Sequence, residues 1–181
     1  MAPCPPKFSV MVGRILPVTR PAADRRHNMK KLILCAALGA MVMAPAAFAE
    51  EHVIEMRNMG SDRQSMVFEP AYLEVEPGDT VTFVNAMGVH NAQTIDGMLP
   101  DGVEGFVGDM NSDISFTASE EGLYGIKCMP HYGMGMVALI KVGDGEAPNL
   151  EAAASVRHPG RARMRMADLL EQATAVPDVG S

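Results

Sequence analysis

Short segments in which apolar and polar residues alternate recur through the middle of the chain. The first, residues 52–57, reads His-Val-Ile-Glu-Met-Arg and has the two-residue period of a half-buried β-strand. Turn residues separate such segments, as in Glu-Pro-Gly-Asp at 76–79. The strands predicted in this way are residues 52–57, 66–68, 72–75, 80–84, 90–95, 114–117, 123–128 and 137–142. Short strands with turn signals at this interval predict a β-sandwich.

The pattern changes after Gly145, where helix-forming residues replace alternation. Asn149 is expected to be the N-cap of a first helix that begins at residue 150. A second helix is predicted from residue 159 to about residue 174, and its apolar stripe is expected to contain Met164, Leu169 and Leu170. We therefore expect an all-β domain over residues 50–146 and a C-terminal helical tail over residues 147–181.

The N-terminal residues have the pattern of a secretory signal peptide. Basic residues at 30–31 are followed by an apolar stretch over residues 32–44 and by Ala-Phe-Ala, which ends at Ala49. We expect residues 29–49 to be the signal peptide. The apolar stretch is too short for a membrane span and is followed by Pro45. Residues 1–28 are interpreted as an upstream extension from a misassigned start codon.

Composition becomes more informative once these segments are set aside. From Glu50 onward there are 21 acidic and 8 basic residues, which gives a net charge of −13. Such an acidic chain is not expected to bind nucleic acid. Cys128 is the one cysteine of that part of the sequence, so an internal disulfide cannot form. An unpaired thiol in an exported protein needs another role, and metal ligation supplies one.

A cluster of metal-ligand residues surrounds this cysteine. The segment Cys128-Met-Pro-His131-Tyr-Gly-Met-Gly-Met136 has the spacing Cys-x2-His-x4-Met, and His90 lies upstream. One thiolate, two imidazoles and one thioether form the ligand set of a blue-copper electron-transfer site. The alternative is a nucleophilic or merely buried cysteine, which would need neither the thioether nor the second histidine. We expect one type 1 copper ion bound by His90, Cys128, His131 and Met136.

From about Glu50 to its end, the chain resembles the pseudoazurins, a family of periplasmic cupredoxins. The matching segments are Met66-Val-Phe-Glu-Pro70, Pro77-Gly-Asp-Thr-Val81, His90-Asn91, Gly97-Met98-x-Pro100-Asp-Gly102 and Cys128-x-Pro-His-Tyr-Gly-Met-Gly-Met136. The resemblance implies a cupredoxin-like Greek-key β-sandwich with a helical tail. It also implies a soluble periplasmic protein that carries single electrons through Cu(I) and Cu(II) and is not an enzyme. A monomer is the expected state of a carrier that must release its partner quickly.

The resemblance also implies roles for residues around the ligands. Asn91 is expected to tie the two ligand loops together, with its backbone amide pointing at the sulfur. Met66 is expected to pack near the ligands, and Pro130 contributes no amide hydrogen there. Family spacing favours Met136 over Met134 as the axial ligand. The expected roles are His131 as the electron port and an apolar docking patch formed by Met87, Pro130, Gly133 and Met134.

Implied partners are redox proteins of denitrification, chiefly copper nitrite reductase, with cytochromes or other periplasmic reductases as further candidates. The sequence departs from the family here, because typical members carry lysines around the copper end. Residues 85–90 and 107–113 contain no lysine, and the second stretch adds Asp109 and Asp113. Two alternatives remain: copper binding for delivery without electron transfer, and a copper enzyme. His52 and His158 are expected to be ordinary surface or edge histidines.

Overall fold

The structure is a computed structural model of the chain and describes residues 49–175. The expected upstream extension (1–28) and the expected signal peptide, apart from its last residue, lie outside the described residues. None of the described helices is long and apolar enough to cross a membrane.

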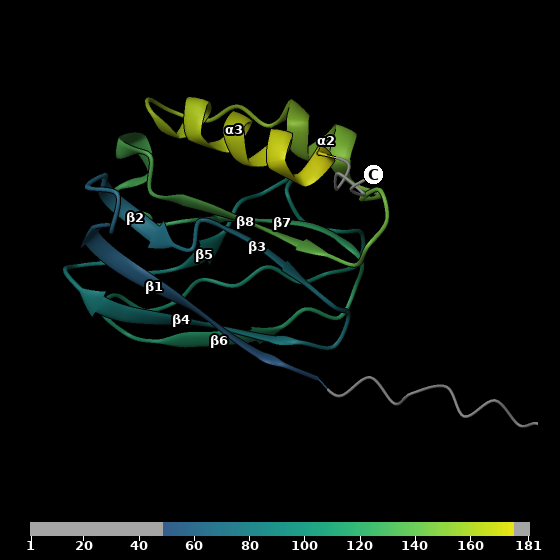
Figure 1. The fold of residues 1–181 in the computed structure, drawn as a ribbon, viewed down its shortest axis with the longest axis horizontal. Coiled ribbons are helices and arrows are strands. Elements are labelled where there is room, and N and C mark those ends of the chain that lie inside the picture. Colours follow the sequence, from purple (N-terminus) through teal and green to yellow (C-terminus); the bar gives the residue numbers. More distant parts are fainter. Residues whose placement is uncertain (1–48, 176–181) are drawn as a thin grey trace, which may run out of the picture. The chain divides into compact units, whose positions relative to one another are not determined.

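Within residues 49–175, eight strands form two four-stranded sheets (Figure 1). The first sheet has the order β2 (Ser65–Glu69), β1 (Glu51–Met59), β4 (Thr80–Met87), β6 (Ile114–Thr117). The second has the order β3 (Tyr72–Val75), β8 (Val137–Val142), β7 (Gly122–Lys127), β5 (Gln93–Thr94). The β1–β4 and β3–β8 pairs are parallel, and the other pairs are antiparallel. The predicted β-sandwich is confirmed.

The eight predicted strands are present, with one large difference in length. The strand predicted over residues 90–95 contains only Gln93 and Thr94, since the residues before them form a loop. In that loop the carbonyl of His90 accepts a hydrogen bond from Asn111, and the carbonyl of Ala92 accepts one from Gly108. These bonds run to a neighbouring loop and not to a strand ladder, which is why the apolar pattern overestimated the strand.

Alternation along the strands places the core between the two sheets. Ile54 and Met56 of β1, and Val81 and Phe83 of β4, are fully buried, while their neighbours in sequence are more exposed. Phe83 packs edge-to-face on Phe68 with ring centroids 5.6 Å apart. Burial of each such side chain contributes about 1.5–3 kcal/mol relative to exposure. This core holds the two sheets in the register that brings the functional loops together.

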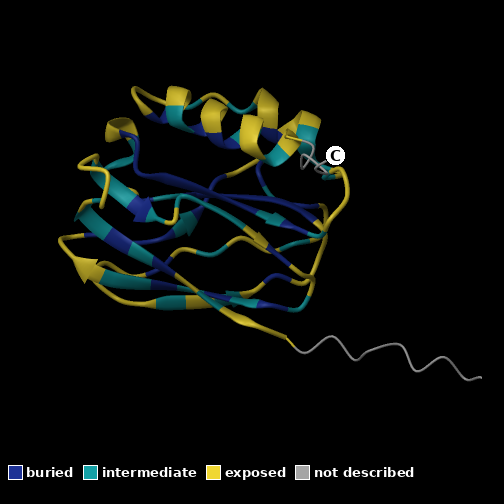
Figure 2. Cartoon of the chain, viewed as in Figure 1, coloured by how far each residue is buried: buried dark blue, intermediate teal, exposed yellow. Residues whose placement is uncertain are grey.

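Two helices, α2 (Leu150–Ser155) and α3 (Ala162–Thr174), lie over the sheet that contains β7 and β8 (Figure 1). Figure 2 shows β7 and β8 dark blue beneath helices whose outer faces are yellow, because both faces of these strands are covered. The predicted helical tail is therefore confirmed as an element. Its helices pack on Leu123 and Leu139 through a second apolar cluster.

Two details of the tail differ from the sequence prediction. Met164 is 65% exposed, and the buried stripe of α3 consists of Ala162, Met166 and Leu169, whose spacing of four and three residues follows one helix face. Asn149 stands at the N-cap of α2 but makes no capping hydrogen bond. Its amide group instead donates to the carbonyl of Leu123 and accepts from the Leu123 amide, both at 2.8 Å. Asn149 therefore fastens α2 to β7.

Candidate metal centre

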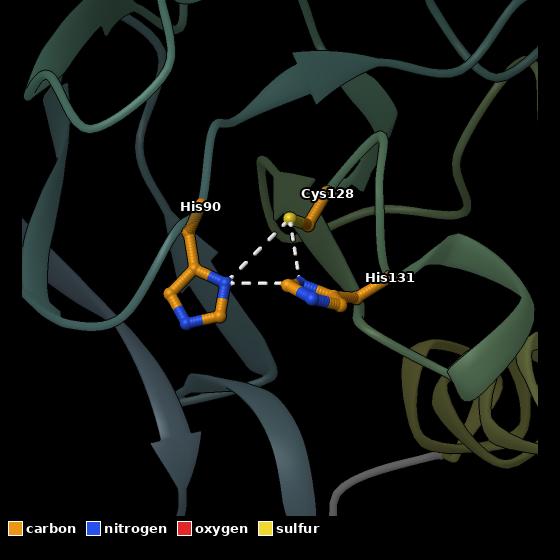
Figure 3. Close-up of side chains that lie close together, drawn as sticks. All are labelled: His90, Cys128 and His131. Atoms are coloured by element: carbon orange, nitrogen blue, oxygen red, sulfur yellow. Dashed lines mark hydrogen bonds between the residues drawn. The ribbon is translucent and has the colours of Figure 1, made fainter.

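Three potential ligands from two loops converge at one end of the sandwich (Figure 3). His90 lies in the loop between β4 and β5, Cys128 follows β7 directly, and His131 lies three residues further on. The Cys128 Sγ atom is 3.7 Å from His90 Nδ1 and 3.6 Å from His131 Nδ1. The two Nδ1 atoms are 3.2 Å apart. Residues 41 positions apart in sequence thus present one sulfur and two nitrogens to the same point.

The spacing of these three atoms fits coordination of a single metal ion. In protein zinc sites, the metal–sulfur and metal–nitrogen bonds are about 2.3 and 2.0 Å long, and we use these lengths as the reference. Ligands at trigonal to tetrahedral angles would then be separated by about 3.5–3.7 Å for sulfur and nitrogen, and about 3.3–3.5 Å for two nitrogens. The observed separations lie at or within about 0.1 Å of these ranges. A thiolate with two imidazoles in this arrangement is typical of blue copper.

The orientation of His90 is fixed by a hydrogen bond on the far side of its ring. Its Nε2–H donates to the carbonyl oxygen of Met87 at 2.9 Å, so the Nδ1 lone pair points toward Cys128 and His131. His90 is fully buried. Burial lowers the pKa of His90, and the neighbouring His131 lowers it further, so the neutral form that binds metals is favoured. His131 is partly exposed.

The Cys128 sulfur lies in an apolar environment with two backbone donors. Burial raises the pKa of the Cys128 thiol, and the backbone amides of Asn91 and His131 oppose this rise by pointing at the sulfur. Because a metal ligand must be the thiolate, binding of a cation here releases the proton of the thiol. The two amides then stabilise the negative charge that remains on sulfur.

A tight loop carries three of the four predicted ligands. The Cys128 amide donates to the carbonyl of Met136 at 3.0 Å, and the Met136 amide donates to the carbonyl of His131 at 3.2 Å. Between them lies a single 3₁₀ turn, η1 (Tyr132–Met134), which ends at Gly135 with φ +97°, a backbone conformation that favours glycine. Met136 is fully buried in the same apolar cluster as Cys128, whereas Met134 is 44% exposed.

Asn91 links three loops around the site. Its side-chain amide donates to the carbonyl of Gly108 at 3.1 Å, and its side-chain oxygen accepts from the Met129 amide at 2.9 Å. The loop with His90 and the loop with Cys128 are therefore joined by a buried side chain. Met66 is partly buried against the cluster that contains Cys128 and has φ +54°. Pro130 is exposed.

The predicted docking patch is exposed. Met87 is 63% exposed, and Gly133 and Met134 are exposed beside the partly exposed His131. Two further apolar side chains were missed in the sequence, Val89 at 59% and Met129 at 61%. Each of them directly adjoins a predicted ligand in the sequence, which is a signal that could have found them.

Two histidines outside the cluster differ from expectation, since both are partly buried and have polar partners. His158 Nδ1 is 2.6 Å from the Tyr132 hydroxyl, and His52 Nε2 is 2.9 Å from Asp79 Oδ2. Lys127 lies 5.2 Å from the centre of the Tyr132 ring, within range of a cation–π interaction. The tail and the strand before Cys128 thus both reach the loop of the candidate ligands.

A β-sandwich that brings a thiolate and two imidazoles together at one end defines the cupredoxin class of copper-binding proteins. Residues 54–143 match the family model of copper binding proteins of the plastocyanin/azurin family. A pseudoazurin of Paracoccus pantotrophus is 45% identical over 135 residues, which cover 74% of this chain and 91% of that protein. A pseudoazurin of Methylorubrum extorquens is 41% identical over 145 residues, covering 78% and 96%.

Solved structures agree with these sequence matches. The crystal structure of native pseudoazurin from Hyphomicrobium denitrificans has a TM-score of 0.64 and 40% identity, and covers 67% of this chain and 97% of that chain. The chain belongs to the pseudoazurin family, whose members are blue copper electron carriers and not enzymes. The predictions of family, of copper as cofactor and of a non-enzymatic role are confirmed.

Proposed function

We propose that the chain is a periplasmic carrier of single electrons, with one copper ion held by His90, Cys128 and His131 and by Met136 as the weak axial ligand. The observation that carries this proposal is the convergence of one Sγ and two Nδ1 atoms within 3.7 Å of one another. When bound, copper supplies a one-electron couple between Cu(II) and Cu(I). Thiolate and thioether favour Cu(I), and imidazole also accepts Cu(II).

The surrounding residues keep this ligand set from moving when the charge of the site changes. Asn91 joins the two ligand loops through two hydrogen bonds, and the Met87 carbonyl fixes the ring of His90. Both interactions are made between groups of the protein itself, so they restrain the ligand loops without a contribution from the metal. A site that rearranges little on reduction transfers electrons quickly, which suits a carrier.

The direct test is to load residues 50–181 with Cu(II) and record visible absorption and EPR spectra. We expect an intense sulfur-to-copper charge-transfer band and narrow copper hyperfine splitting, both lost in Cys128→Ser. Met136→Leu should alter the spectrum, whereas Met134→Leu, which changes an exposed thioether in the same loop, should not. A pale protein with ordinary copper splitting would contradict the ligand assignment and favour copper delivery.

The path of the electron is proposed to run through His131 and the docking patch formed by Met87, Pro130, Gly133 and Met134. His131 is the partly exposed member of the ligand cluster, and apolar side chains surround it in the loop. Exposed apolar patches on soluble proteins often mark docking surfaces. The proposed partners are copper nitrite reductase, cytochromes or other periplasmic reductases, met by a monomer that releases quickly.

Charges of both signs border this patch, although the family's lysines are missing from it. The Arg161 amide donates to the carbonyl of Gly133 at 3.0 Å, and Lys127 lies against Tyr132, so two cationic residues adjoin the loop. Asp113 accepts a hydrogen bond from the amide of Asn85, two residues before Met87. We therefore expect an association rate with copper nitrite reductase that changes little with ionic strength. Stopped-flow rates that rise steeply with salt would show that like charges meet.

A further inference from the structure

Arg165 of α3 reaches from the helical tail to the backbone of the loop that ends in Met136. Its Nη1 donates to the carbonyl of Gly135 at 2.7 Å and to the carbonyl of Met66 at 2.9 Å. Its Nη2 donates to the carbonyl of Ser65 at 3.2 Å. A guanidinium presents its donors in a fixed plane, so one side chain holds these carbonyls at fixed mutual positions. Three segments far apart in sequence therefore meet at a single group.

Two of the residues whose carbonyls accept hydrogen bonds from Arg165, Met66 and Gly135, have positive φ angles. Met66 has φ +54°, a conformation that non-glycine residues adopt rarely and that persists only where the surroundings impose it. Gly135 has φ +97°, and a Cβ atom there would lie 2.9 Å from the Cδ of Arg165. The side chain of Arg165 thus lies directly on Gly135, and the absence of a side chain at Gly135 permits this contact.

Each of these positions adjoins the candidate copper site. Met136 follows Gly135 directly, and the Met66 side chain packs on the buried cluster that contains Cys128 and Met136. An axial thioether in a blue-copper site makes a long and weak bond. Because such a bond exerts little force of its own, the surrounding protein determines the position of the Met136 sulfur.

We propose that Arg165 is a positioning residue that sets the place of the Met136 thioether relative to Cys128 by holding the carbonyls of Gly135 and Met66. The inference rests on the proposed function, in which Met136 is the axial ligand. Arg165 touches no ligand atom itself and acts through the backbone. Burial lowers the pKa of Arg165, and the nearby Arg161 lowers it further. The backbone carbonyls around the guanidinium replace the water that it loses.

The test compares Arg165→Met and Arg165→Lys with Arg163→Met as the matched control. Arg163 lies on the same helix and carries the same charge, but it is exposed. In copper-loaded Arg165→Met the axial contact should loosen, so the EPR signal becomes more axial and the ratio of the two charge-transfer bands changes. Arg165→Lys keeps the charge but lacks the planar fork, so it should shift in the same direction by a smaller amount. Arg163→Met should match the parent protein.

A second readout uses the metal-free protein. The Met136 amide donates to the carbonyl of His131, and we expect its hydrogen exchange to be at least tenfold faster in Arg165→Met than in Arg163→Met. If Arg165→Met does not fold, the spectra and the hydrogen exchange at Met136 are both measured on Arg165→Lys. Unchanged spectra and unchanged exchange at Met136 would overturn the inference, even with a lower melting temperature. A parent protein without the blue spectrum would instead overturn the proposed function, and the exchange result would still be informative.

Discussion

At the scale of single residues, the surroundings of the Cys128 sulfur determine how the site holds its charge. The backbone amides of Asn91 and His131 point at the sulfur. Pro130 lies between Cys128 and His131 and has no amide hydrogen to donate. Hydrogen bonds to a thiolate stabilise it, and the greater negative charge on the sulfur in the reduced state makes them favour Cu(I). The number of amides near the sulfur therefore affects the reduction potential.

Pro130→Ala is expected to raise the reduction potential, because alanine has the amide hydrogen that proline lacks. An added hydrogen bond that favours the reduced state by about 1 kcal/mol corresponds to about 40 mV for a one-electron couple. Protein-film voltammetry measures this shift. Pro77→Ala is the control, since Pro77 is exposed in the turn before β4 and far in sequence from the ligands. A potential that stays the same or falls in Pro130→Ala would show that the new amide does not face the sulfur.

The sequence predicted the candidate ligands because most of their information is local. Cys128, His131 and Met136 lie within one loop, and their spacing is visible without a fold. Arg165 could not be found in this way, since its partner Met66 is 99 residues away and no periodic pattern connects the two. The same holds for His158, whose hydrogen bond to Tyr132 depends on how the tail crosses the loop.

At the scale of elements, the start of α3 supports the loop of residues 128–136, which carries Cys128, His131 and Met136. Gly160 has φ +53°, and a Cβ atom there would lie 2.2 Å from the carbonyl oxygen of Gly133. The next residue, Arg161, donates its amide to that same oxygen. This close approach explains how a helix outside the sandwich can hold η1. Gly160 and Gly133 both lie outside the strands, so the alternating pattern that predicted the strands could not indicate this contact.

Gly160→Ala should separate α3 from the loop. The left-handed conformation costs an alanine about 1–2 kcal/mol, and the clash with a backbone oxygen adds to it. We expect thermal unfolding of the metal-free protein to occur at least about 5 °C lower. Gly145→Ala is the matched control, because a Cβ atom there meets nothing within 4 Å. Equal melting temperatures for the two variants would mean that the contact between Gly160 and Gly133 contributes nothing to stability.

At the scale of the whole molecule, the residue just before the first strand contacts a buried carboxylate. The backbone nitrogen of Glu50 donates to Asp79 Oδ1 at 2.7 Å, and Asp79 also accepts from His52 and from the amide of Glu76. The amide of Glu50, and then His52, lower the pKa of the Asp79 carboxyl. A carboxylate with a depressed pKa in the folded state contributes stability above its unfolded pKa, and this stability is lost as the pH falls below about 4.

Cleavage after Ala49, the site expected from the signal-peptide pattern, would convert that nitrogen into an ammonium group beside a buried carboxylate. We expect the chain of residues 50–181 with a free amino terminus to be about 1 kcal/mol more stable near pH 6 than the same chain with an acetylated terminus. Acetylation keeps one N–H donor and removes only the charge, so urea unfolding of the two forms isolates the ion pair. In Asp79→Asn, acetylation should change nothing. The difference should also shrink near about pH 10, where an α-amino group is neutral. Equal stability of the free and acetylated chains at pH 6 would show that the new charge is not held by Asp79.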